Sequence, residues 1–385
     1  MPSRFIASSP RAAILAVFTS FGAAVGALAG SMPSIMRNAG IDAETMGLGL
    51  TMSTLMTVSA MSLGGQVARF ASNRAVLLAV FPAFGLFLFA YLTAQSPLWF
   101  YMAIIPMGVC FGLTDLFMNA EAVAIEHDMR RPVFTAFHGS VSAGVAAAAI
   151  ASSFISTLLG TWATGLLVIA LFALAWNMVW RGIPTRALAK RKTAEGRSTL
   201  RIKTPLVLLG ISAGLIIAAE TAALLWSAKL LDEQAPALAA VAGLGAAFYG
   251  VCNAAVRFPG DRLRSYFGDM PLMIGSLVVS IGGFAALGFT KNFAASVAAF
   301  AAVGLGTALL IPCIFAMAAN FSPENRAGGL SFVSLLTAAP RTLAPWFFGL
   351  VAAGFGTSAA FSLVALGLVA ALVLIITLKH TGKHA

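Results

Sequence analysis

One apolar stretch of the sequence is interrupted by acidic side chains whose spacing could support chemistry. The stretch FGLTDLFMNAEAVAIEHD (residues 111–128) carries Asp115, Asn119, Glu121 and Glu126. On a helix, Asp115, Asn119 and Glu126 fall within about 40° of one line along the helix surface. Glu121 lies on another face. A carboxylate in an apolar environment is unstable unless it is paired, hydrated or neutralised by a proton, and a proton-coupling site depends on that instability. We predict that Asp115 and Asn119 contact a substrate or a proton; a fixed ion pair is the alternative.

Two more ionisable side chains interrupt apolar runs in the second half of the sequence. Glu220 lies in LIIAAETAALLWSAKLL, and Arg341 lies in SFVSLLTAAPRTLAPW. Arg341 continues a polar line that begins at Ser334 and Thr337, and such a line is expected to face away from lipid. Its guanidinium stays charged and presents a planar fork that suits carboxylate or phosphate. Two interpretations remain open: Arg341 neutralises Glu220 or Asp115, or it binds an acidic group on a substrate.

A histidine and two arginines complete the candidate set. His138 precedes Ser142 by one turn in an apolar run, where it is either a structural residue or part of a proton relay. We predict that Arg257 and Arg262 form a cytoplasmic gate with Glu126. The three cysteines lie within apolar runs without the spacing of a metal site, so we expect no metal and no cofactor.

The composition indicates that membrane-spanning helices carry these residues. Of the 385 residues, 59% are hydrophobic and 10% charged, whereas about a quarter of a soluble domain is charged. Apolar stretches of about 20 residues recur along the whole chain, long enough to cross a bilayer as helices, and their unbroken hydrophobicity argues against a membrane β-barrel. The first stretch is too long for the apolar core of a signal peptide, so we expect it to be retained as a span. The twelve predicted spans are residues 12–36, 46–68, 75–95, 97–125, 132–158, 162–180, 204–229, 237–259, 271–290, 293–320, 329–354 and 357–378.

The distribution of Lys and Arg predicts the orientation of the spans. With the N-terminus in the cytoplasm, that side receives twenty of the 24 cationic residues and the opposite side receives three. This positive-inside pattern places both termini in the cytoplasm of a bacterial-type inner membrane. The net charge of +11 then reflects topology rather than a nucleic-acid surface. Residues 181–203 hold eight Lys and Arg against one Glu, and we predict that this basic linker separates an N-terminal bundle, 1–180, from a C-terminal bundle, 204–385.

The two halves resemble each other and, together, a known family. The fourth span reads GVCFGLTDLFMNAEAVA and the tenth AVGLGTALLIPCIFAMA, and the Arg-rich loops GGQVARFASNR and PGDRLRSYFGD follow the second and eighth spans. With twelve spans and a basic central linker, these loops resemble the major facilitator superfamily, whose loop signature is G-x-x-x-D-R-x-G-R-R. Gly65 and Arg74 match the ends of that signature, but Arg69 stands where the family has Asp. The resemblance implies an all-α membrane fold of two six-helix bundles.

Within that superfamily, the segment TDLFMN resembles the acid-x-x-x-Asn element on the fourth helix of the fucose:proton symporter branch. There the acid belongs to the proton and sugar site, a role that the resemblance carries over to Asp115, with Asn119 as its neighbour. The first span here lacks the second acid of that branch. The fifth span, HGSVSAGVAAAAIASS, lacks the proline-containing signature of proton-driven drug antiporters.

These features together predict a secondary transporter that moves a small polar organic solute, acidic or sugar-like, by alternating access. Proton coupling is expected because the sequence has no phosphate-binding loop for ATP. We expect a monomer whose partners are the substrate, protons and the lipid bilayer, without nucleic acid. The alternatives are an exporter of drug-like compounds or metabolites, an intramembrane enzyme and a non-transporting receptor. An enzyme is disfavoured because no motif such as H-E-x-x-H or a nucleophile elbow occurs.

Overall fold

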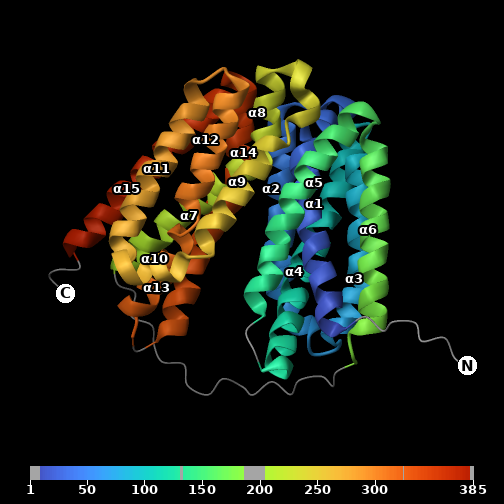
Figure 1. Ribbon diagram of the computed structural model, residues 1–385, viewed down its shortest axis with the longest axis horizontal. Coiled ribbons are helices and arrows are strands. Elements are labelled where there is room, and N and C mark those ends of the chain that lie inside the picture. The colour runs from blue at the N-terminus through green and yellow to red at the C-terminus, as the bar shows by residue number, and fades with distance from the viewer. Residues whose placement is uncertain (1–8, 131–132, 186–203, 324, 382–385) are drawn as a thin grey trace, which may run out of the picture. The chain divides into compact units, whose positions relative to one another are not determined.

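The structure, a computed structural model, describes residues 9–130, 133–185, 204–323 and 325–381 (Figure 1). This part of the chain contains 12 helical segments long and apolar enough to cross a membrane, which confirms the predicted all-α membrane fold. The helices of the first half are α1 (Pro10–Ala39), α2 (Ala43–Val67), α3 (Asn73–Leu92), α4 (Pro97–Met129), α5 (Phe134–Leu158) and α6 (Thr161–Gly182). Those of the second half are α7 (Thr204–Leu225), α8 (Ser227–Gln234), the 3-10 helix η1 (Pro236–Val241), α9 (Leu244–Arg257), α10 (Gly260–Phe267), α11 (Asp269–Phe289), α12 (Phe293–Thr307), α13 (Leu310–Phe321), α14 (Arg326–Phe355) and α15 (Thr357–Thr381).

The chain divides into two compact units. Unit 1 comprises residues 1–191 together with 239–243, and unit 2 comprises residues 192–238 and 244–385. Within unit 1, α1 packs along α5, and α4 packs against both α2 and α3. Within unit 2, α7 packs against α14 and α15, and α12 packs against α9 and α11. Of the predicted linker, residues 186–203 lie outside the part of the chain that the structure describes.

Side chains just before several helices fix where those helices begin. Ser9, Ser72 and Ser96 each accept a hydrogen bond from a backbone N–H in the first turn of the helix that follows. Asp42 does the same for α2, with its Oδ1 atom 2.8 Å from the backbone N of Thr45. The N–H of Thr45 stabilises the ionised carboxylate and lowers the pKa of Asp42 below its usual range. These caps satisfy N–H groups that have no partner inside the helix.

Glycines allow two helix pairs of unit 1 to pack backbone against backbone. Gly22, Gly26 and Gly30 face α5, and a Cβ added at any of them would lie 2.1–2.3 Å from a backbone oxygen of that helix. Gly108 and Gly112 on α4 approach the backbone of α2 in the same way, at 2.3 and 2.5 Å. The four-residue spacing keeps the glycines of each helix on one face, so each pair reproduces the small-xxx-small packing of membrane helices.

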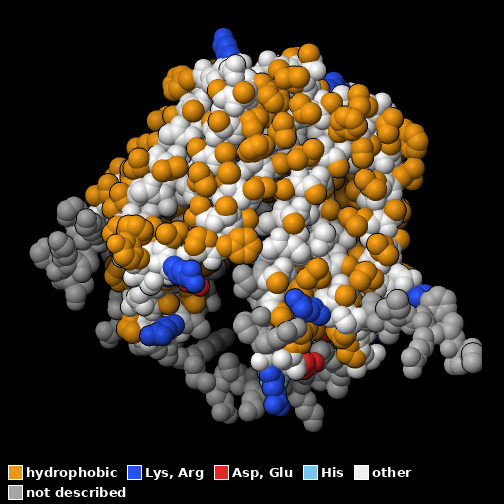
Figure 2. All heavy atoms as spheres, in the orientation of Figure 1, with side chains coloured by type: hydrophobic (Ala, Val, Ile, Leu, Met, Phe, Trp, Pro, Cys, Tyr) orange, Lys and Arg blue, Asp and Glu red, His pale blue; other side chains and the backbone are white. Residues whose placement is uncertain are grey.

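The described helices carry apolar side chains outward as well as inward. Leu86, Leu98, Leu166 and Val373 are each more than half exposed although they lie in spans. Figure 2 shows hydrophobic side chains along the lengths of the helices and Lys and Arg near the helix ends. Exposed apolar surface of this extent is unfavourable in water and suits the hydrocarbon of a bilayer, where the backbone polar groups are satisfied inside each helix. The chain is therefore a multi-pass integral membrane protein.

Candidate functional site

The predicted acid of unit 1 accepts hydrogen bonds from a side chain on its own helix. Asn119 donates through Nδ2 to the side-chain Oδ1 of Asp115 at 2.9 Å and to the backbone oxygen of the same residue at 2.8 Å. Both side chains are partly exposed, and they lie one turn apart near the middle of α4. This pair, called the α4 group below, confirms the predicted adjacency of the two residues. Its role in binding or coupling stays a prediction.

A neighbouring acid has a structural contact that sequence reasoning did not assign. Glu121 is 1% exposed, and its Oε2 accepts a hydrogen bond from Nδ2 of Asn73 at 3.0 Å. Asn73 belongs to the Arg-rich loop GGQVARFASNR, so this buried carboxylate ties that loop to α4. In the same loop, Arg74 donates to the backbone oxygen of Trp180 at 2.8 Å and lies over its ring. The loop signature thus secures the start of α3 to α4 and α6.

The structure places Glu126 and His138 at the two sides of the α4–α5 connection. Glu126 accepts a hydrogen bond from the backbone N of Val133 at 2.7 Å, directly before α5. His138 is exposed on α5, and its ring meets Phe18 of α1 edge to face at 5.4 Å between ring centres. Ser142, predicted to share its face, donates to its backbone oxygen at 3.5 Å. A gating role for Glu126 and a relay role for His138 remain predictions.

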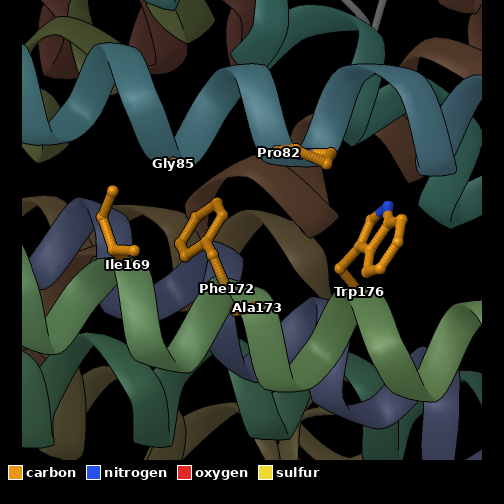
Figure 3. Close-up of a pocket in the computed structure, with 6 residues that line it drawn as sticks. All are labelled: Pro82, Gly85, Ile169, Phe172, Ala173 and Trp176. Atoms are coloured by element: carbon orange, nitrogen blue, oxygen red, sulfur yellow. The ribbon is translucent and has the colours of Figure 1, made fainter.

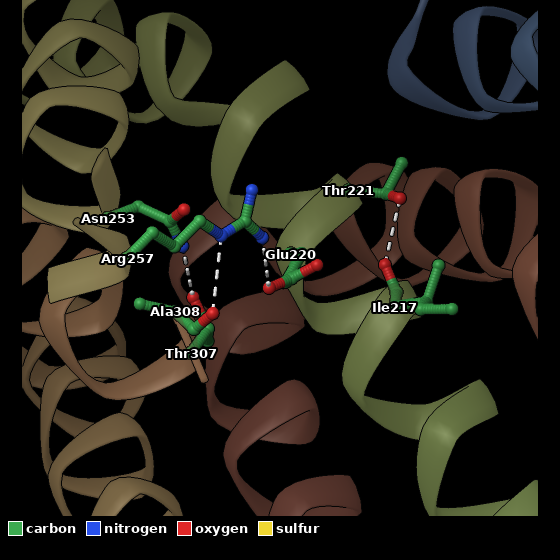
Figure 4. A network of polar contacts seen from close by, with 7 residues as sticks. All are labelled: Ile217, Glu220, Thr221, Asn253, Arg257, Thr307 and Ala308. Carbon is green, nitrogen blue, oxygen red and sulfur yellow. Dashed lines mark hydrogen bonds and ion pairs between the residues drawn. The ribbon is translucent and has the colours of Figure 1, made fainter. Parts of the chain in front are cut away.

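In unit 2, charged and polar side chains from three helices meet around Glu220 (Figure 4). Oε1 of Glu220 on α7 lies 3.9 Å from Nη2 of Arg257 on α9, within ion-pair distance but beyond hydrogen-bond distance. The Glu220 side chain is 19% exposed and the Arg257 side chain 49% exposed. That oxygen atom of Glu220 is buried and accepts no hydrogen bond from the residues that the structure describes.

The same arginine also contacts a break in the tenth span. Nε of Arg257 donates to the backbone oxygen of Ala308 at 3.2 Å, between the end of α12 and the start of α13. One turn earlier on α9, Nδ2 of Asn253 donates to Oγ1 of Thr307 at 3.2 Å. Glu220, Asn253, Arg257, Thr307 and the carbonyl of Ala308 are called the three-helix network below. Arg257, predicted as a gate residue, is the cation that faces Glu220.

Arg341, the alternative partner proposed for Glu220, lies near the middle of α14. It is partly exposed and makes no ion pair with the residues that the structure describes. On the predicted polar line before it, Thr337 is buried and donates to the backbone oxygen of Ser334 at 2.6 Å. Within unit 2, Arg341 is therefore a mid-span cation that Glu220 does not neutralise.

The second predicted gate arginine lies on the short helix α10. Arg262 is exposed, and its backbone oxygen accepts a hydrogen bond from Ser265. Its neighbour Arg264 donates to Asp269 at 2.8 Å, which fastens α10 to the first residue of α11. Arg262 does not belong to the three-helix network, and its gating role stays a prediction.

Two apolar cavities lie away from these polar groups. One, of about 240 Å³, lies between α3 and α6 and is lined by Pro82, Gly85, Ile169, Phe172, Ala173 and Trp176 (Figure 3). The other, of about 230 Å³, lies among α7, α14 and α15 and is lined mainly by Ala, Leu, Val and Phe. Neither lining includes a charged side chain, so neither cavity provides the polar contacts that a soluble substrate requires.

Comparison with solved structures identifies the architecture. A mutant form of nucleoside transporter NupG superposes with a TM-score of 0.80 at 15% identity, covering 95% of this chain and 98% of that one. A D-xylose-proton symporter gives a TM-score of 0.73 at 14% identity, with coverages of 94% and 95%. The chain has the major facilitator superfamily fold. At these identities the likeness concerns the fold alone.

Sequence comparison finds similarity to the major facilitator superfamily. The family model described as Major Facilitator Superfamily matches residues 233–385. Membrane protein MosC of Rhizobium meliloti is 26% identical over 365 residues, covering 91% of this chain and 86% of that protein. An uncharacterized MFS-type transporter of Yersinia pestis is 27% identical over 353 residues, covering 90% and 89%. The proteins matched are a membrane protein and a transporter, and neither is described as an enzyme. The narrower resemblance to the fucose:proton symporter branch is not confirmed.

In this major facilitator fold, sequence reasoning missed the residues that complete the three-helix network. Thr307 and Ala308 carry no charge and lie in an apolar span, so nothing in their own types marks them. A signal was nevertheless present at Pro312, four residues after Ala308, because proline cannot donate the helical hydrogen bond to that carbonyl. That proline marks the Ala308 carbonyl as one that needs another donor, but which side chain supplies it depends on how the helices pack.

Proposed function

We propose that this protein is a secondary active transporter that moves a small polar organic solute by alternating access, coupled to protons. The observation that carries the proposal is the pair of Glu220, within the first span of unit 2, and Arg257, at the end of the next span, 3.9 Å apart. Ionisable side chains within spans are costly, and they commonly mark the path of an ion or substrate. Both residues lie on helices that the fold provides rather than on loops, which suits a site of fixed geometry.

The geometry of this pair supports exchange rather than a permanent strut. The closest atoms are too far apart for a hydrogen bond, and Oε1 of Glu220 has no described donor. A carboxylate held this loosely can accept a proton, because protonation removes a buried charge without breaking a strong contact. It can also release Arg257 to another carboxylate. A proton on Glu220 and an acid on the substrate are thus alternative ways to complete the same site.

For the substrate, we propose an organic solute that carries both hydrogen-bonding groups and an acidic group. Arg341 supports the acidic group, since it is a mid-span cation without a described ion-pair partner. The α4 group supports hydrogen bonds to hydroxyl or amine groups, because it presents a carboxylate and an amide on adjacent turns.

A second candidate substrate class is a neutral sugar or nucleoside. The structural neighbours include a nucleoside transporter and a D-xylose-proton symporter, and this similarity favours neutral polyhydroxylated solutes. In that case Arg341 would bind hydroxyl groups or a substrate carbonyl instead of a carboxylate. We further propose a bacterial-type inner membrane, both termini in the cytoplasm, and a monomeric carrier. The bacterial relatives and the excess of Lys and Arg in the predicted cytoplasmic segments support this placement.

A ligand screen followed by transport tests the proposal. Purified full-length protein would be heated with uridine, D-xylose, succinate and glutamate in turn, and a raised Tm that is lost in Arg341→Ala would favour the acidic class. A raised Tm with uridine or D-xylose alone would favour the neutral class. Compounds that bind would then be offered to proteoliposomes with an imposed pH gradient.

The transport assay is decided by one substitution. Glu220→Gln keeps the size and hydrogen-bonding capacity of the side chain but removes its proton site, so uptake driven by the pH gradient should be lost while the protein remains folded. Thr221→Val is the matched control on the same helix, because among the described residues Thr221 donates to the backbone oxygen of Ile217 on its own helix (Figure 4). Gradient-driven uptake at the wild-type rate in Glu220→Gln would remove Glu220 from the coupling role.

A further inference from the structure

A proline leaves one backbone carbonyl without its helical donor at the place where the three-helix network forms. In a continuous helix, the carbonyl of Ala308 would accept a hydrogen bond from the N–H of residue 312, but residue 312 is proline and has no N–H. The helix is interrupted here, since α12 ends at Thr307 and α13 begins at Leu310. Ala308 is 0% exposed, so bulk water does not reach the residue. A buried carbonyl in this position requires another donor.

Arg257 is that donor. Its Nε atom lies 3.2 Å from the oxygen of Ala308, while its Nη2 atom lies 3.9 Å from Glu220 (Figure 4). A guanidinium is rigid and planar, so a hydrogen bond at Nε fixes the direction in which the two Nη atoms point. The freed carbonyl therefore holds the arginine in the orientation that faces the carboxylate.

The first half of the chain contains the same arrangement with a neutral donor. Pro82 lies inside α3, and the carbonyl of Leu78, four residues before it, accepts a hydrogen bond from Nε1 of Trp176 at 2.9 Å. Figure 3 shows Pro82 on α3 and the Trp176 side chain extending from α6 toward that helix. In both cases a proline within a span frees a carbonyl, and a side chain from a neighbouring span bonds it. Of these two donors, the one opposite Pro312 is charged and faces an acid.

We propose that Pro312 is a positioning residue for the site of Glu220: by keeping the Ala308 carbonyl free of a helical donor, it holds Arg257 beside Glu220. The inference rests on the proposed function for its consequence in transport. Pro312→Ala supplies the missing N–H, which bonds Ala308 within the helix and competes with Arg257. The arginine then loses its anchor although neither it nor Glu220 has been changed.

The reactivity of Arg257 tests this without knowledge of the substrate. Purified full-length protein is treated with phenylglyoxal, an arginine reagent, and modification of each arginine is followed by peptide mass spectrometry. In Pro312→Ala, Arg257 should react about fivefold faster than in the wild type, the population change that accompanies loss of one net hydrogen bond. Arg262, which is exposed and outside the network, is the internal reference and should be unchanged. Pro82→Ala is the matched control and should leave Arg257 at the wild-type rate.

Two results would overturn the proposal. One is wild-type reactivity of Arg257 in Pro312→Ala; the other is a rise of the same size at Arg341, which would indicate general loosening of unit 2. Where Pro312→Ala does not give folded protein, Pro312→Gly supplies the same N–H and is measured in its place. A cycle with Arg257→Lys provides the second readout: lysine lacks the fork and has no Nε anchored by Ala308, so the change in Tm caused by Pro312→Ala should differ between the wild-type and Arg257→Lys backgrounds. Equal changes in both backgrounds would also overturn it.

The positioning role of Pro312 and the coupling role of Glu220 are tested by different variants, so either can be wrong while the other stands. If Arg257 reactivity is unaffected by Pro312→Ala while Glu220→Gln abolishes uptake, the positioning role is wrong and the transport role stands. If Glu220→Gln retains gradient-driven uptake while Pro312→Ala releases Arg257, the geometry is correct and the coupling role of Glu220 is wrong.

Discussion

The two halves of this chain place their mid-span acids in different ways. In unit 1, Asp115 is bonded by Asn119, one turn further along the same continuous helix. In unit 2, Glu220 faces Arg257 from another helix, and Arg257 is itself held at a break in a third. The first arrangement follows from the geometry of one helix, whereas the second exists only when three helices are packed.

The fourth and tenth spans, which resemble each other in sequence, form different helices in the two units. The fourth span forms a single helix, α4, through Asp115 and Asn119, although it contains Pro106 earlier in its length. The tenth span is divided into α12 and α13, with Pro312 in the first turn of the second helix. A helix break exposes carbonyl groups that a continuous helix conceals. In unit 2 a carbonyl at a break anchors an arginine that faces the acid, whereas in unit 1 a neutral amide on the same continuous helix bonds the acid directly.

We expect the largest effect on stability and uptake from removal of Arg257, which belongs to the arrangement in unit 2. Arg257→Ala removes the cation opposite Glu220 and the donor to Ala308 together, so the free energy of unfolding should fall by on the order of 2–3 kcal/mol. Uptake driven by a pH gradient should be lost. Thermal unfolding in detergent and proteoliposome uptake measure the two effects. Arg262→Ala is the control, since that side chain is exposed, and a comparable loss of stability there would contradict the assignment.

A neutral member of the three-helix network should have the next largest effect. Thr307→Val keeps the shape of the side chain but leaves the buried amide of Asn253 without its acceptor, which should cost about 1–2 kcal/mol of unfolding free energy. Thr221→Val removes a hydrogen bond within one helix and should cost less than about 0.5 kcal/mol. Thermal unfolding of both variants compares the cost of losing a contact between helices with the cost of losing a contact within one helix. Equal costs would contradict the expected difference.

The α4 group should respond more weakly to removal of its donor. Asn119→Ala deletes the amide that bonds Asp115 from one turn along the same helix and leaves α4 continuous, so the expected cost is about 1 kcal/mol. Thermal unfolding would measure it alongside Arg257→Ala. A loss as large as that of Arg257→Ala would mean that the α4 group also depends on packing between helices.

A small effect is also expected for a local acid outside the spans. Asp42 caps α2, and Asp42→Ala should lower the unfolding free energy by about 0.5 kcal/mol at neutral pH. Because the pKa of Asp42 is lower in the folded protein than in the unfolded chain, its contribution is present above the unfolded value and is lost as pH falls through the folded one. The difference in Tm between wild type and Asp42→Ala should therefore shrink on going from pH 7 to pH 3. A difference that grows on acidification would contradict this.

Much of the fold and part of the site were predictable from the sequence. All twelve spans were predictable, because about 20 consecutive apolar residues are stable in few environments other than a lipid bilayer. The pairing of Asp115 with Asn119 was also predictable, since residues four apart on a helix are always neighbours. The contact of Glu121 with Asn73 was not, because the two residues are 48 positions apart.

The partner of Glu220 could not be predicted from the sequence. Arg341 and Arg257 are both cations on later helices of the same half, and nothing in their spacing from Glu220 distinguishes them. Arg257 is selected because α9 packs against α12, which brings it to the freed carbonyl of Ala308. The choice depends on the position of a helix break in a third segment of the chain.

The sequence by itself determined the membrane environment, the number of spans and the contact of Asp115 with Asn119 one turn along the helix, because burial in lipid and helical spacing act on neighbouring residues. Only the tertiary structure decided which charges meet across helices. That decision depends on the packing of α7, α9 and α12 and on one carbonyl that Pro312 leaves without a donor. A contact between distant residues is specified by the whole packed unit, and no local pattern encodes it.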